Sequence, residues 1–184
     1  YEVLARPIDD AAGEAFDKSA HLLGFDYPGG PALANLADQS ENKTFTLPRV
    51  MRENREFSFS GLKTAISQLI RQQGVAVRQD ATLRAEMAVA IQDAIIDALL
   101  FKLKLALRET GLKQVALTGG VAANRKLRER VAALKGIEVF CPSPALCTDN
   151  AAMIAFAAAA RLKSGKLIAG ELEVLSRWPV EEIH

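Results

Sequence analysis

The segment from residue 114 to residue 163 constrains the fold most, because strand-like and helix-like runs alternate along it. Val115 to Leu117 form an apolar run that ends in a Thr118-Gly119-Gly120 turn, and a helical pattern follows over residues 122–134. Residues 137–140 form a second strand-like run, after which a proline-containing loop leads into an alanine-rich helical pattern that ends near Gly165. This order is typical of an α/β sheet whose functional loops lie at the carboxyl ends of the strands. The sequence therefore predicts an α/β fold.

Three further segments place apolar residues at helical spacing. The longest has one apolar residue in every four from Leu83 to Leu103 and closes at Gly111, which predicts a long buried helix. The other two cover residues 12–23 and 62–74, and the first follows Asp9 and Asp10, which are residue types that cap helix N-termini.

The remaining segments predict strands and turns. Residues 1–5 and 44–47 are strand-like, and residues 48–55 form a polar surface loop with three arginines. Two prolines and two glycines within residues 27–31 predict a rigid turn without regular structure. Such a turn exposes its backbone and can approach a ligand closely.

Composition and charge exclude several classes of protein. The chain is 49% hydrophobic and 24% charged, as in ordinary globular proteins, and no apolar run reaches the ~18 residues that cross a bilayer. The two cysteines are too few for a disulfide scaffold, so we expect a cytoplasmic protein without membrane contact. The chain has 23 basic and 22 acidic residues, so its net charge gives no general attraction for nucleic acid. A nucleic-acid partner therefore requires a local basic patch.

Two positions at helix starts have two interpretations each. Gly119 and Gly120 could present backbone N–H groups to an anion at a helix N-terminus, or they could only form a tight turn. Asp149 could cap the last helix or ligate a metal ion. The two histidines, His21 and His184, form no metal-binding pair.

Three other sets of polar residues also allow more than one interpretation. Ser58, Ser60 and Lys63 suggest a nucleophile and a base, although helix capping explains them as well. Asp17 lies too far into its helix to act on the dipole and shares a face with Asp10 and Glu14. A basic run could meet phosphates or simply face solvent, and it consists of Arg125, Lys126, Arg128 and Arg130.

Six segments together resemble the tRNA threonylcarbamoyladenosine transferase family, whose older name is the glycoprotease family. They occur in the family's order and are DDAAGEAFDK (residues 9–18), YPGGP (27–31), FSFSGLK (57–63), TGGVAANR (118–125), CTDNAAMI (147–154) and RWP (177–179). The resemblance implies an actin-like, sugar-kinase-like (ASKHA) ATPase fold, with a mixed sheet and a large helical part, of which residues 1–184 would be the C-terminal lobe.

The resemblance also implies an activity and a site. Family members transfer the threonylcarbamoyl group from threonylcarbamoyl-AMP to N6 of the adenosine beside the anticodon, in tRNAs that read codons beginning with A. The implied nucleotide-binding residues, for ATP or threonylcarbamoyl-AMP, are Asp17, Gly30, Gly119, Gly120 and Asn124. Asp149 matches a ligand of the family's divalent metal ion, iron or zinc. The implied partners are tRNA and the other subunits of the modification machinery. No catalytic residue is implied.

Two departures from the family pattern bear on activity. The family's H-x3-H metal motif and phosphate-binding segments belong to a first lobe that this sequence does not contain, so we expect a chain that is inactive alone. Because such a lobe would leave an apolar face uncovered, we also expect self-association into homo-oligomers. The second departure is Ala34, which stands where some members have an acidic ligand-contacting residue. The alternative function is that of a non-catalytic scaffold with the same fold. An endopeptidase activity is disfavoured, because the sequence shows no arrangement of a nucleophile and no zinc-protease motif.

Overall fold

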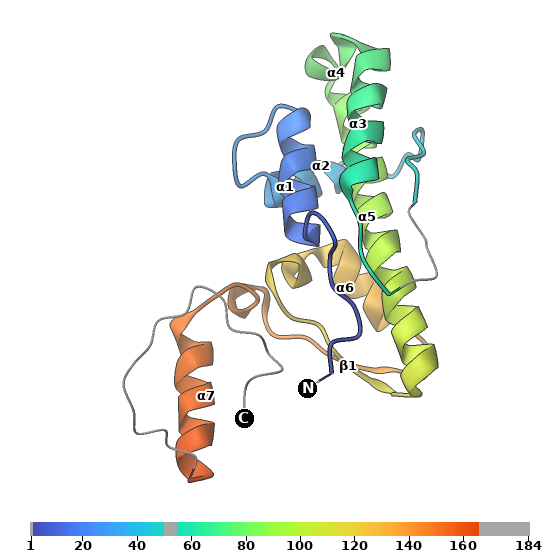
Figure 1. Ribbon diagram of the computed structural model, residues 1–184. Helices are drawn as coiled ribbons and strands as arrows, with labels where there is room; N and C mark the ends of the chain where they lie inside the picture. The colour runs from blue at the N-terminus through green and yellow to red at the C-terminus, as the bar shows by residue number, and fades with distance from the viewer. Residues whose placement is uncertain (1, 50–54, 166–184) are drawn as a thin grey trace.

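The structure is a computed structural model, and it describes residues 2–49 and 55–165 (Figure 1). Five helices precede the first strand, and a second helical part follows it. In chain order the elements are α1 (Ala12–Leu22), α2 (Gly30–Ala37), α3 (Ser60–Gln73), α4 (Ala76–Gln79), α5 (Ala81–Thr110), β1 (Gln114–Ala116), the 3₁₀ helix η1 (Gly120–Ala123), α6 (Arg125–Ala132), β2 (Glu138–Phe140), the 3₁₀ helix η2 (Pro144–Leu146) and α7 (Ala151–Lys163).

Helix α5 is the long buried helix that the sequence predicts. It begins at Asp80, whose side chain accepts hydrogen bonds from the Thr82 and Leu83 amides, and it ends at Gly111, which adopts a left-handed φ of 70°. Ile91 and Ile95 are fully buried, and α1, α2, α4 and α6 all contact this helix. The main hydrophobic core therefore surrounds α5.

The two strands form a parallel sheet connected through η1 and α6. Gln114 pairs with Glu138, Val115 with Val139 and Ala116 with Phe140. Only the central pair of valines is half-buried, since alternate residues of a strand point to opposite faces. This mixed architecture, mostly helical with a small parallel sheet, confirms the predicted α/β class and is consistent with an actin-like fold.

Some local predictions are wrong. Residues 44–47 form no strand. The residues just before them are held on α5 by polar contacts, since the Asn42 side-chain amide donates to Glu86 and Lys43 pairs with Asp93. Residues 2–5 form no strand either, and Pro7 makes only a single parallel bridge with Phe57.

The turn predicted over residues 27–31 contains the start of a helix. Gly30 and Pro31 open α2, since proline in the first turn of a helix sacrifices no hydrogen bond. Gly29 lies so close to α1 that an added Cβ would be 2.5 Å from the Ala20 Cβ. Close packing on α1 therefore requires glycine at this position.

Helix α7 stands apart from the core in Figure 1. None of its residues is buried, and its apolar side chains are largely exposed, Phe156 at 79% and Ile154 at 64%. The expected self-association stays a prediction, and this helix presents apolar surface that could take part in it. Across the described residues, no helix combines the length and the apolar character needed to cross a membrane.

Candidate functional site

Asp17 and Gly30 meet where α1 packs on the start of α2. The Gly30 amide donates a 2.8 Å hydrogen bond to Oδ1 of the half-buried Asp17, so the carboxylate caps α2 from a different helix. A Cβ on Gly30 would lie 3.2 Å from Oδ1 and 3.3 Å from the Phe16 Cβ, which is tighter than ordinary contact. Glycine therefore allows the carboxylate to approach the α2 N-terminus.

The glycine pair at the end of β1 forms an open turn. Gly119 has φ 89° and ψ 166°, a conformation that disfavours any other residue, and an added Cβ would meet nothing within 4 Å. Gly120 begins η1, and a Cβ there would lie 3.9 Å from Cγ2 of Thr148. The structure thus brings this turn beside the residue that precedes Asp149.

Asn124 caps α6 and ties it to α5. Its Oδ1 accepts a 2.9 Å hydrogen bond from the Leu127 amide, and its Nδ2 donates a 2.7 Å bond to Oε1 of Gln92. Gln92 is buried within α5, and the sequence analysis did not single it out. The signal that could have identified Gln92 is its polar side chain within the apolar series of a buried helix.

Asp149 does not cap α7, which corrects the first of its two interpretations. The cap is the next residue, Asn150, whose Oδ1 accepts a 3.0 Å hydrogen bond from the Met153 amide. Asp149 itself is exposed, and its carboxylate has no hydrogen bond or ion pair with any described residue.

The metal expected at Asp149 needs more donors than its surroundings supply. Within residues 2–49 and 55–165, no three side chains of His, Cys, Asp or Glu are grouped so that they could hold a metal ion. These residues therefore do not fit a metal site by themselves.

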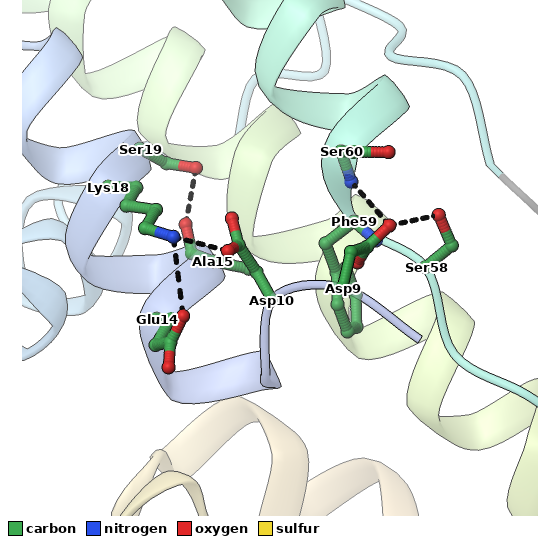
Figure 2. A network of polar contacts seen from close by, with 9 residues as sticks. All are labelled: Asp9, Asp10, Glu14, Ala15, Lys18, Ser19, Ser58, Phe59 and Ser60. Atoms are coloured by element: carbon green, nitrogen blue, oxygen red, sulfur yellow. Dashed lines mark hydrogen bonds and ion pairs between the residues drawn. The ribbon is translucent and has the colours of Figure 1, made fainter. Parts of the chain in front are cut away.

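Asp9 and Asp10 precede α1, but neither of them caps it. The N-cap of α1 is Ala11, which has no capping side chain, so the prediction that Asp9 or Asp10 caps this helix is wrong. Figure 2 shows that Asp9 reaches the start of α3. It accepts hydrogen bonds from the Ser58 hydroxyl at 2.6 Å and from the Phe59 amide at 2.8 Å.

These contacts shift the pKa values of Asp9 and Lys18 in opposite directions. Burial tends to raise the pKa of Asp9, but the hydrogen bonds from Ser58, Phe59 and Ser60 outweigh it and hold the pKa below the ordinary 3.8. Lys18 pairs with Asp10 and with Glu14, and the hydrogen bond to Asp10 is the main cause that raises the pKa of Lys18 (Figure 2). The Ser58 hydroxyl therefore donates to the carboxylate that accepts from the first amides of α3, and the N-cap of α3, Phe59, has no capping side chain. The interpretation of Ser58 and Ser60 as helix caps is wrong, because Asp9 takes that role from a distant segment.

The basic run on α6 is largely engaged within the protein. Arg125 pairs with Asp38 and Glu129, and Arg130 pairs with Asp97. The half-buried Arg128 donates to the carbonyl oxygens of Ala122 and Pro142 and, at 3.2 Å, to Sγ of the buried Cys147. Three of the four cations thus stabilise the protein, which corrects their interpretation as a free basic face.

The expected site residues fall into two groups. Asp17 and Gly30 form one, and the Gly119-Gly120 turn forms the other with Asn124 and the Asp149 loop. Helix α1 connects the groups, since it packs on α2 and also contacts η1, where Gly13 faces Val121. The family model of the tRNA N6-adenosine threonylcarbamoyltransferases, TsaD, matches residues 1–156. The chain belongs to this family.

Membership confirms the resemblance carried by the sequence motifs. The match covers five of the six segments, and the RWP segment at residues 177–179 lies outside both the match and the described residues. The family comprises transferases that act in threonylcarbamoyl modification of tRNA.

Proposed function

We propose that this chain forms part of an enzyme that transfers the threonylcarbamoyl group of threonylcarbamoyl-AMP to N6 of the adenosine beside the anticodon, in tRNAs reading codons that begin with A. A bond forms between N6 and the carbamoyl carbon, the bond from that carbon to the AMP phosphate oxygen breaks, and N6 loses a proton. The family match over residues 1–156 carries the proposal. The cytoplasm is the proposed location.

Asp17 is the proposed ligand for the hydroxyl groups of the adenylate. Its Oδ1 accepts from the Gly30 amide, and Oδ2 has no hydrogen-bond partner among the described residues, so it can accept a hydrogen bond from a ligand. Because Gly30 holds the carboxylate at the α2 N-terminus, the acceptor is fixed before a ligand arrives. Gly30 thereby takes part in the site through its backbone.

The Gly119-Gly120 turn is the proposed support for the phosphate. The open space over Gly119 permits close approach to the backbone, and Gly120 lies at the positive end of η1. Asn124 binds Leu127 and Gln92, which leaves one N–H of its amide for the nucleotide. This group is proposed to contact the adenylate together with Asp17.

Asp149 is the proposed metal ligand of this chain. Its carboxylate is exposed and is not used for capping, and its loop adjoins the glycine turn. We propose that further ligands come from outside the described residues, since these hold no group of three His, Cys, Asp or Glu side chains that could bind a metal ion. We propose that residues 1–184 act as the C-terminal lobe and that a first lobe with the H-x3-H motif completes the site, together with the partner subunits.

The test compares two proteins in one assay. Residues 1–184 alone, and the same residues joined behind the first lobe of a family member, are incubated with threonylcarbamoyl-AMP and a cognate tRNA. The nucleosides are then analysed by mass spectrometry. N6-threonylcarbamoyladenosine from the joined protein, with none from the lobe alone, supports the proposal. No product from either, with a folded joined protein and its partner subunits present, favours the scaffold alternative.

A further inference from the structure

A polar groove lies between α1 and α3, and none of the proposed adenylate contacts lines it. Its volume is about 500 Å³, and residues 9 and 10 together with Lys18 line one side. The α3 side consists of Ser60, Lys63, Thr64, Ser67, Gln68 and Arg71. These six residues recur at three- and four-residue intervals, so they share one face of the helix.

The chemistry of the α3 face is that of a phosphate-binding surface. Proteins contact nucleic-acid phosphates with arginine, lysine, hydroxyl and amide side chains, and the six residues are all of these types. The described residues that line the groove all have polar or charged side chains, which argues against a hydrophobic ligand or the apolar centre of a protein interface.

The acidic residues of the groove already have partners. Asp9 binds the start of α3 through Ser58 and Phe59, and Asp10 pairs with Lys18 (Figure 2). Lys63 and Arg71 are exposed, and neither has an ion pair or hydrogen bond with any described side chain. Helix α3 contains no acidic residue, so both cations remain available to a ligand.

The positions of the two cations suit a chain of phosphates better than a single anion. They are eight residues apart on one helix, which corresponds to about 12 Å along its axis. A net charge of +1 gives the protein no general attraction for RNA, and the basic run on α6 is engaged internally. The pair of cations in the groove supplies a local attraction for RNA phosphates that the overall charge of the protein does not provide.

We propose that the α1/α3 groove binds the sugar-phosphate backbone of the tRNA substrate, with Lys63 and Arg71 contacting separate phosphates. Ser60, Ser67 and Gln68 then donate hydrogen bonds to the same strand. The proposal rests on the proposed function, because it takes tRNA as the RNA that is bound.

The test measures the affinity of residues 1–184 for a fluorescent tRNA transcript over a range of salt concentrations. The double charge reversal Lys63→Glu/Arg71→Glu should weaken binding at least tenfold. The neutral variant Lys63→Gln/Arg71→Gln should make the slope of log K against log salt shallower by about 1.5 to 2, since two phosphate contacts are lost. The matched control Lys104→Glu/Arg108→Glu changes the same charges on exposed residues of α5 and should have a smaller effect.

Three results would overturn the groove as the RNA site. They are no binding by the wild-type chain at low salt, equal losses in the groove and control variants, and displacement of the transcript by polyglutamate as effectively as by unlabelled tRNA. Calorimetry with threonylcarbamoyl-AMP on the same proteins separates this proposal from the proposed function. The groove variants should bind the adenylate as the wild type does, and failure of adenylate binding alone leaves the groove proposal standing.

Discussion

The carboxylate of Asp17 accepts a hydrogen bond of 2.8 Å from the amide of Gly30, which lies thirteen positions later in the chain. This contact joins two of the motifs that identify the family, DDAAGEAFDK and YPGGP. It makes one carboxylate serve both as the cap of α2 and as a fixed acceptor for a ligand. Several contacts of this kind, between motifs, determine how the site is built and lead to testable consequences.

Removal of the Asp9 carboxylate should destabilise the start of α3. Asp9→Ala leaves the Phe59 and Ser60 amides without their acceptor, and we expect a loss of about 1 kcal/mol, as for other N-cap residues. Asp10→Asn is the matched control, because the side chain of Asp10 contacts only Lys18 among the described residues, and loss of that ion pair should cost less than about 0.5 kcal/mol. Urea unfolding of both variants measures the difference, and equal losses would contradict the assignment.

The same contact predicts a pH dependence. The pKa of Asp9 in the folded protein lies below its ordinary value of 3.8, so ionised Asp9 stabilises the fold above that value. The contribution is lost as the pH falls from the ordinary pKa through the lowered one. The stability difference between wild type and Asp9→Ala should therefore narrow from pH 7 to pH 3 in thermal melts, whereas a constant difference would exclude this linkage.

Gly29 and Gly13 should respond in opposite directions to alanine. Gly29→Ala places a Cβ 2.5 Å from that of Ala20, and we expect a loss of about 1–3 kcal/mol from overpacking. Gly13→Ala meets only Cγ2 of Val121 at 3.7 Å, within helix α1, and should stabilise the protein by up to about 1 kcal/mol. Denaturant unfolding tests both, and a neutral Gly29→Ala would show that the α1–α2 turn can move away.

Arg128 should behave as a structural residue and not as an RNA contact. Arg128→Ala leaves the carbonyl oxygens of Ala122 and Pro142 without a donor, and we expect a loss of about 1–3 kcal/mol. Its neighbour Lys126 has no ion pair with any residue that the structure describes, so Lys126→Ala should change stability by less than about 0.5 kcal/mol. Urea unfolding of both variants measures their stability and separates the two roles. If Arg128→Ala unfolds with the free energy of the wild type, Arg128 has no structural role.

The sequence predicted the elements whose signals are local. Helix α5, the two strands and the glycine turn between β1 and η1 follow from apolar spacing and from residues such as Gly111 that end a helix. The start of α2 was missed because Pro31 and the glycines before it favour a turn, while packing on α1 decides the outcome. The partners of Asp9, Asp17 and Arg128 were out of reach, because each contact depends on how distant segments fold together.

Asp149 and Asn150 provide a paired test of capping against metal binding. Asn150→Ala should cost about 1 kcal/mol of stability, since its side chain caps α7, whereas Asp149→Asn should leave stability unchanged. In the protein joined to the first lobe, Asp149→Asn should lower the metal content, because a neutral amide replaces an anionic ligand. Wild-type metal content in that variant would remove Asp149 from the proposed metal site.

The most direct test of the proposed function is formation of the modified nucleoside by the joined protein carrying Asp17→Ala. The variant loses the acceptor that is proposed to hold the adenylate, and Asn at the same position is the milder control because it keeps an oxygen for Gly30. We predict N6-threonylcarbamoyladenosine from the wild type, less from Asp17→Asn and almost none from Asp17→Ala, with all three proteins folded. Equal amounts of product from the three proteins would contradict the proposed adenylate site.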